Sequence, residues 1–217
     1  FYRKKGETLG LVGESGCGKT TVGRTLLRLY EPTDGTIIYD GDVIFDKKKK
    51  IAVNMLPYRR KMQMVFQDPY GSLNPAKRIG WILEEPLRMK HAYSAEERRQ
   101  KVDEMLDKVG LDRKCREHYP NELSGGQRQR VAIAQALLCD TKFLIADEPV
   151  SALDVTIQAQ IINLLMDLKA KLNLTMLCDF YELTMGNGYL KAGFQDRITY
   201  FDVYFRSVPD GGGHALA

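Results

Sequence analysis

A glycine-rich segment, GESGCGKT, lies between a short apolar run and a helical pattern, and few folds can accommodate that arrangement. Residues 8–12 form the apolar run, and Val22, Leu26 and Leu29 recur at helical spacing after the glycines. Residues 13–20 fit G-x-x-x-x-G-K-[ST], a pattern expected by chance in on the order of one chain in a hundred of this length. Strand, glycine loop and helix are the context that the motif requires. The sequence therefore predicts a phosphate-binding loop.

The residue types in this loop suit an anionic ligand. Glycines let the backbone approach closely, so that N–H groups and the helix N-terminus face the phosphates. Lys19 would neutralise the terminal phosphates, and Thr20 would ligate Mg²⁺. Cys17 lies inside the loop, where bound nucleotide should protect it from a maleimide. The predicted nucleotide-binding residues of this segment are Gly13, Glu14, Ser15, Gly16, Cys17, Gly18, Lys19, Thr20 and Thr21.

The overall composition limits the classes of protein to which the chain can belong. The 217 residues are 44% hydrophobic and carry a formal charge of +4, with the bases spread along the chain. We therefore expect a folded domain and no nucleic-acid partner, and we interpret the lysine run 47–50 as a solvated loop. Since no apolar run approaches about 20 residues, we expect a soluble chain without direct membrane insertion. The four cysteines are far apart, which indicates reduced thiols in the cytoplasm.

The remaining patterns predict an α/β fold. Residues 36–45 indicate a hairpin with a turn at Asp40-Gly41, and Ser94 with Glu97 indicates a capping box. Strands that alternate with helices imply a parallel core sheet with right-handed crossovers, here with a small antiparallel β part and an inserted helical subdomain. The expected strands are 62–66, 143–146 and 174–178, and the region 75–138 is expected to be mostly helical. Within that region one helix has an apolar face and ends at Gly110; the residues of this face are Val102, Met105, Leu106 and Val109. A further helix is indicated by the apolar residues Ile157, Ile161, Leu164, Leu165 and Leu168.

Two adjacent carboxylates follow the strand at 143–146. By itself such a pair is usually a surface turn, but beside a phosphate loop Asp147 would hold the metal, directly or through water. Glu148 would then polarise the attacking water as a general base. Gln67, at the end of its own strand, is either a plain loop residue or a ligand of the same water or metal.

A second glycine-containing segment, LSGGQ, precedes a helix through Val131, Ala134 and Leu138. Ser124 is either an ordinary N-cap residue or part of a second phosphate site, because Gly125 and Gly126 would expose backbone donors at a helix N-terminus. One chain with two phosphate-binding segments suggests two chains that share two nucleotides.

Taken in order, GESGCGKT, the loop at Gln67, LSGGQ, FLIADEP and SALD resemble the ATP-binding subunit of ABC transporters. DEPVSALDVTIQAQIINLL resembles the dipeptide and oligopeptide importers in particular. The resemblance covers residues 1–177, with the helical subdomain at about 75–138, and implies a P-loop NTPase fold that binds ATP and Mg²⁺. It implies catalytic roles for Glu148, Gln67 and Lys19, and metal contacts from Thr20, Gln67 and Asp147.

The same resemblance implies partners. In a head-to-tail dimer of ATP-binding subunits, Ser124, Gly125, Gly126 and Gln127 of one subunit would close over the triphosphate held by Lys19 of the other. Asp154 would cross that interface. Residues 68–87 would meet transmembrane permease subunits, which places the chain at the cytoplasmic face of the cell membrane as a peripheral protein.

The chain departs from this family at both ends. The aromatic residue that stacks on adenine would precede residue 1, so we expect the domain to be incomplete at its N-terminus as well as at its C-terminus. The family carries a histidine after the strand at 174–178, where this chain has Tyr181. Losing one such contact typically lowers the rate by about 10² to 10³, so the alternative is nucleotide binding without turnover. We interpret the three histidines, His91, His118 and His214, as surface or packing residues.

The last part of the chain, residues 178–217, resembles the N-terminal segment of nicotinate phosphoribosyltransferase through DFYELTMGNGYLKAG and FDVYFRSVPDGGG. That family has a tyrosine near the nicotinate site, which would be Tyr181. The segment is too short for the enzyme's barrel, so this likeness implies a remnant joined to the ATP-binding domain, by a gene fusion or by a mistaken join. We expect a weak helix at 182–189 and a strand at 199–205 that covers the free edge beside the phosphate-loop strand.

Overall fold

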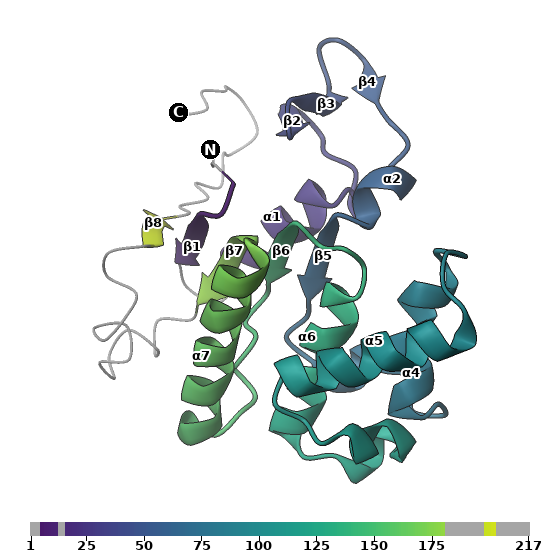
Figure 1. Cartoon of the computed structure of the whole chain (residues 1–217). Coiled ribbons are helices and arrows are strands. Elements are labelled where there is room, and N and C mark those ends of the chain that lie inside the picture. Colours follow the sequence, from purple (N-terminus) through teal and green to yellow (C-terminus); the bar gives the residue numbers. More distant parts are fainter. Residues whose placement is uncertain (1–4, 13–15, 181–197, 203–217) are drawn as a thin grey trace.

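A five-stranded parallel sheet forms the centre of the described structure (Figure 1). The computed structural model describes residues 5–12, 16–180 and 198–202. The strand order β5-β6-β7-β1-β8 confirms the predicted parallel core, and the strands are β1 (Thr8–Val12), β5 (Met62–Val65), β6 (Phe143–Ala146), β7 (Thr175–Phe180) and β8 (Ile198–Asp202).

The strand order brings the predicted phosphate-binding, metal-binding and catalytic segments to one edge of the sheet. β7 lies between β1 and β6, so Leu177 is opposite both Leu9 and Ile145. Parallel strands present their carboxyl ends on the same side, where ligands bind in open α/β sheets. The segments after β1, β5 and β6 contain the glycine loop, Gln67 and Asp147, respectively.

Both faces of the sheet are buried, as is usual for parallel strands. Successive side chains of β6 point in opposite directions. Ile145 belongs to the core cluster that includes Leu9 and Leu27, whereas Leu144 and Ala146 belong to the larger cluster that includes residues of the helical part. The sheet therefore separates two apolar layers.

Helix α1 (Lys19–Leu26) follows the glycine loop and packs on the sheet through Gly23. A Cβ atom at Gly23 would lie 3.1 Å from Ile145 Cγ2, which shows how close the helix is to β6. The helix is shorter than predicted. Leu29 lies outside it and is 46% exposed, because Arg28 adopts a left-handed conformation with φ 49° and redirects the chain.

The predicted hairpin is confirmed in the antiparallel sheet of β2 (Thr36–Tyr39), β3 (Asp42–Asp46) and β4 (Ile51–Ala52). Asp40 and Gly41 both have positive φ, 52° and 90°, as a two-residue type I′ turn requires. The short helix α2 (Leu56–Arg59) leads back to β5.

The predicted helical region lies on the other side of the molecule from β2–β4 (Figure 1). The predicted capping box at Ser94 and Glu97 is present, the four residues of the predicted apolar face are buried, and Gly110 follows with φ 69°. The elements are α3 (Pro69–Ser72), α4 (Ile79–Arg88), α5 (Ala95–Lys108), the 3-10 turns η1 (Arg113–Glu117) and η2 (Pro120–Glu122), and α6 (Gly125–Leu137).

Helix α7 (Val155–Leu172) ends at Asn173, whose φ of 51° lets the chain turn into β7. The predicted helix is therefore confirmed, and β7 begins one residue after the predicted start. Strand β8 lies parallel to β1 on the side away from β7, with Thr8 opposite Ile198. This confirms that a strand from the C-terminal part covers the phosphate-loop strand. Residues 203–205 of the predicted strand, the helix predicted at 182–189, Tyr181 and His214 lie outside the described residues.

None of the helices in the described part of the chain combines the length and the apolar character that a bilayer-spanning helix requires.

Candidate functional site

The described part of the glycine loop turns through two glycines. Gly16 and Gly18 have φ 82° and 99°, in the left-handed region that glycine tolerates best. Gly18 is the N-cap residue of α1, and since glycine has no side chain it caps none of the first-turn N–H groups. Those donors, which include the N–H groups of Thr20 and Thr21, suit a phosphate group. Residues 13–15 lie outside the described residues.

Lys19 carries its charge inside the same loop. The residue is only 5% exposed, and its Nζ lies 3.9 Å from Cys17 Sγ. The side chain therefore folds back over the loop that precedes α1, where the sequence predicted a phosphate contact.

Thr20 and Asp147 meet although 127 residues separate them. The Thr20 hydroxyl donates to Asp147 Oδ1 at 2.7 Å, and Asp147 is 3% exposed. The backbone N–H of Asp147 donates to the carbonyl of Val65 at 3.0 Å, which fixes the end of β6 against β5. Adjacent oxygen ligands of an octahedral Mg²⁺ with bonds of about 2.1 Å lie about 3 Å apart. The two oxygens therefore fit one edge of a magnesium coordination shell, and phosphate oxygens or water usually supply the other ligands.

Gln67 and Glu148 form the second contact of the site. Gln67 Nε2 donates to Glu148 Oε2 at 2.7 Å. Glu148 has φ 42°, an uncommon conformation for a non-glycine residue that has an energetic cost and is often found at functional sites. Ser151 supports it, since its backbone N–H and its hydroxyl donate to the Glu148 carbonyl at 3.2 and 3.1 Å. The structure thus joins Gln67 directly to the residue after Asp147.

The LSGGQ segment forms the start of α6. Ser124 is the N-cap residue: its Oγ accepts from the N–H of Gln127 at 3.3 Å, and Gln127 Oε1 accepts from the N–H of Ser124 at 2.9 Å. The N-cap interpretation is therefore confirmed, and the phosphate site stays a prediction compatible with it. In this arrangement Ser124 Oγ accepts, so its hydrogen is not used by the capping box.

Asp154 is the N-cap residue of α7 without a side-chain cap bond, and its side chain is exposed. Sequence reasoning missed Arg128, whose buried guanidinium donates to the carbonyls of Leu123 and Pro120, the second at 3.2 Å. Arg128 stands in the polar stretch Gly125–Arg130 at the start of α6, so no sequence pattern distinguished it from its neighbours. The predicted residues thus form two groups, one at the sheet edge and one at the starts of α6 and α7.

Comparison with known proteins identifies the family to which the chain belongs. The family model described as ABC transporter matches residues 1–151. The chain is 52% identical over 182 residues to the oligopeptide transport ATP-binding protein OppF of Bacillus subtilis, an alignment that covers 83% of this chain and 59% of that protein. It is 48% identical to the dipeptide transport ATP-binding protein DppF of Haemophilus influenzae, over 85% of this chain and 56% of that protein. The chain thus spans somewhat more than half the length of these curated relatives.

Solved structures agree with the fold. A dimeric post-hydrolysis structure of the ATP-binding cassette MJ0796, bound to ADP and Pi, has a TM-score of 0.73 and 32% identity, and the match covers 93% of this chain and 84% of that one. CbiO1 from Clostridium perfringens, part of the ABC transporter complex cbiONQ, has the same TM-score at 28% identity and covers 87% and 72% of the two chains. The glycine loop, the paired carboxylates, the family match and these relatives together show that the chain belongs to the ATP-binding domains of ABC transporters.

Proposed function

We propose that the chain is an ATP-binding and ATP-hydrolysing subunit of a peptide importer. The observation that carries the proposal is the contact between Thr20 and Asp147, because it joins the glycine loop and the carboxylate pair into one site of the right size for Mg²⁺. The names of the relatives support the substrate class, since OppF and DppF are oligopeptide and dipeptide transport proteins.

Different residues of the chain would bind the phosphates, hold the metal and activate the attacking water. The loop amides and Lys19 would hold the phosphates, while Thr20 and Asp147 would hold the metal with Gln67 beside them. Bound Mg²⁺ would neutralise charge on the phosphate oxygens. Glu148 accepts a proton from the attacking water, and Gln67, whose amide now donates to Glu148, orients that carboxylate or the water itself.

The second group of residues supports a head-to-tail dimer. Ser124, Gly125, Gly126 and Gln127 at the start of α6, with Asp154 at the start of α7, would meet the nucleotide of a second ATP-binding subunit. The dimeric solved structure of MJ0796 supports this arrangement. Residues 68–87 would contact transmembrane permease subunits, and the chain would act as a peripheral protein at the cytoplasmic face of the membrane.

The proposal is tested by separating nucleotide binding from turnover in the purified chain. Glu148→Gln should keep ATP affinity within about threefold and lower the hydrolysis rate by about 10² to 10⁴, because only the general base is lost. Thr20→Val should remove the magnesium dependence of binding. Glu96→Gln, which changes an exposed carboxylate on α5, is the matched control and should behave like the unchanged chain. No ATP binding by folded protein would contradict the proposal.

A second candidate function, nucleotide binding without turnover, is favoured by Tyr181 at the position where the family has a histidine. If the missing group limits the rate, Tyr181→His should raise ATP turnover by about 10² to 10³ with little change in ATP affinity. Tyr181→Phe is the control and should leave turnover at its original level. Equal rates for the histidine and phenylalanine variants would show that the missing side chain is not what limits hydrolysis.

For residues 178–217 we propose an origin in a nicotinate phosphoribosyltransferase, without that activity. Trypsin should release one peptide, residues 172–191, that spans both segments. Its detection in the native proteome would establish a fusion, and its absence beside abundant flanking peptides would count against one. Nicotinate-dependent release of pyrophosphate by the purified chain would contradict the expected lack of activity.

A further inference from the structure

The two glycines at the start of α6 rest on residues at the start of α7. A Cβ atom at Gly125 would lie 3.2 Å from Leu153 Cδ2. At Gly126 it would lie 2.6 Å from Ile157 Cγ2, a separation that real Cβ atoms essentially never show. A side chain at Gly126 would therefore require Ile157 or the helices to shift, and one at Gly125 would press on Leu153, so Leu153 and Ile157 form a seat for the first turn of α6.

This seat is fixed on its own side. Leu153 and Ile157 are partly buried and pack against the larger core cluster. The N–H of Leu153 donates to the carbonyl of Val150 at 3.1 Å, and Gln158 Nε2 donates to the carbonyl of Leu153 at 2.9 Å. Because core packing resists small shifts, the seat fixes the distance of Gly125 and Gly126 from α7.

The seat adjoins the predicted residues at the starts of α6 and α7 and is linked along the chain to the sheet-edge residue Glu148. Asp154 stands between Leu153 and Ile157 in the chain, and Ser124 precedes the two seated glycines. On the other side, the turn from Glu148 to Leu153 is tied by Ser151, which donates to the Glu148 carbonyl. One continuous segment therefore connects the proposed general base to the start of α7 and, through the seat, to the start of α6.

We propose that Ile157, supported by Leu153, is a positioning residue that sets Ser124 relative to Asp154, so that the two meet the partner subunit's nucleotide together. This inference rests on the proposed function, because it concerns the second group of binding residues. Ile157 touches Gly126 and no phosphate; it acts through the placement of the α6 N-terminus. A glycine at 126 is then required by the contact with α7 as well as by any ligand.

The geometry provides a direct test. The same hypothetical Cβ at Gly126 lies 2.6 Å from Ile157 Cγ2 but 3.9 Å from Ile157 Cβ, which is ordinary van der Waals contact. Ile157→Ala removes Cγ2 and keeps Cβ, so it should accommodate an alanine at 126. If Gly126 is needed only to let a phosphate approach, the change at 157 should give no relief.

The experiment compares the unchanged 217-residue chain with Gly126→Ala, Ile157→Ala and the double variant. Two readouts are measured: the melting temperature of the monomer, and the concentration for half-dimerisation with Mg²⁺ and a non-hydrolysable ATP analogue. We expect Gly126→Ala to raise that concentration about tenfold or more, and the double variant to recover at least about threefold of the loss. Ile162→Ala, which truncates another partly buried α7 side chain, is the matched control and should not rescue Gly126→Ala.

Each remaining outcome counts against the inference. No recovery in either readout would show that Ile157 does not set the position of Gly126. Recovery of the melting temperature without recovery of dimerisation would show a packing contact without a positioning role. If the unchanged chain binds the analogue but stays monomeric, the dimer in the proposed function fails and the positioning role with it. If it binds no nucleotide, the proposed function fails as a whole, while the melting temperatures still report on the contact.

Discussion

Lys19 and Cys17 illustrate how the backbone conformation of a loop places single side chains. Both belong to a loop with two glycines of positive φ, and the turn returns the lysine side chain over the loop, 3.9 Å from the cysteine sulfur. Lys19 is only 5% exposed, so its positive charge lies at the glycine loop and belongs to the proposed phosphate site.

This placement predicts that Cys17 reports on nucleotide binding. Bound phosphates would occupy the space that a maleimide must enter, so saturating MgATP should slow the labelling of Cys17 at least about tenfold. The rate is measured by mass spectrometry of the tryptic peptides, and Cys17→Ser should abolish the signal.

Cys139 is the internal control for this measurement. Burial raises the pKa of its thiol above the usual value, so it should label slowly at neutral pH. It lies at the end of α6, with its sulfur near the Gln135 carbonyl, and its rate should not respond to ATP. Identical labelling of Cys17 with and without ATP would contradict the loop assignment.

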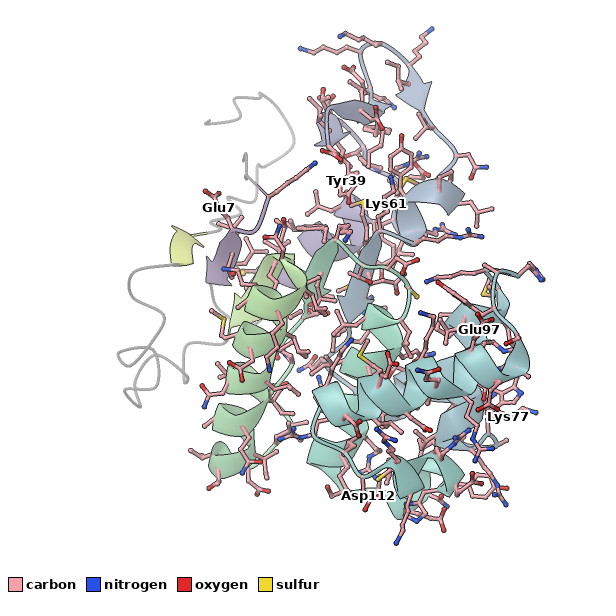
Figure 2. The ribbon with its side chains drawn as sticks, in the orientation of Figure 1. Glu7, Tyr39, Lys61, Lys77, Glu97 and Asp112 are labelled. Carbon is pink, nitrogen blue, oxygen red and sulfur yellow. The ribbon has the colours of Figure 1, made fainter. Side chains whose placement is uncertain are left out.

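At the scale of elements, α5 shows how a local signal fixes a helix start. Ser94 Oγ accepts from the N–H of Glu97 at 3.2 Å, and the Glu97 carboxylate accepts from the N–H of Ser94 at 2.7 Å. Figure 2 shows Glu97 at this end of the helical part. The box orients a helix whose buried face, Val102 to Val109, packs against α4 and α6.

Loss of the cap should therefore destabilise the helical part. Ser94→Ala is expected to lower the free energy of unfolding by about 1 kcal/mol, since a first-turn N–H loses its acceptor. Urea unfolding followed by circular dichroism measures the change, and Ser94→Thr, which keeps a hydroxyl, should lose much less. Equal stability of the alanine variant and the unchanged chain would show that the box does not fix this helix.

Glu97 makes the same element sensitive to pH. The hydrogen bond from the Ser94 backbone N–H, followed by that from its side chain, holds the pKa of Glu97 below its ordinary value. A lowered folded-state pKa means that the carboxylate stabilises the fold above its unfolded pKa and that this contribution is lost as the pH falls through the folded pKa. The unchanged chain should thus be more stable than Glu97→Gln at pH 7, and the difference should shrink below pH of about 4. A difference that is constant with pH would rule out the ionised carboxylate as its source.

At the scale of the whole molecule, the sheet depends on a strand from the far end of the chain. β8 pairs with β1 over its full length, and without it the phosphate-loop strand would be the edge of the parallel sheet. An open edge exposes backbone donors and acceptors and is a liability that proteins usually cover. Strand β8 thus completes the parallel sheet beside the proposed site.

Hydrogen exchange tests this pairing. Amides of β8 should exchange roughly a hundredfold more slowly than an unstructured chain, as expected for a paired strand. A chain that ends at residue 180 should lose protection at the β1 amides that face β8, while those that bond β7 stay protected. Exchange of residues 198–202 at the unstructured rate would contradict the pairing.

The local elements could be predicted from the sequence, because their causes lie within a few residues. Alternating or helical periodicity, the Asp40-Gly41 turn, the capping box at Ser94 and the glycine loop each predicted their structure. Local periodicity was wrong at Leu29, where the chain direction is set by Arg28: its guanidinium is held by the carbonyl of Val53, 25 residues away. No short pattern contains that information.

The contacts between distant segments could not be predicted in the same way and were found in the folded structure. Strand order depends on packing between whole elements, so the position of β7 between β1 and β6 could not be derived from either strand. That order places Thr20 against Asp147 and Gln67 against Glu148. The seat of Gly126 on Ile157 is likewise a product of how two helices approach, because the free energy of such a contact depends on shape complementarity between side chains that are remote in sequence.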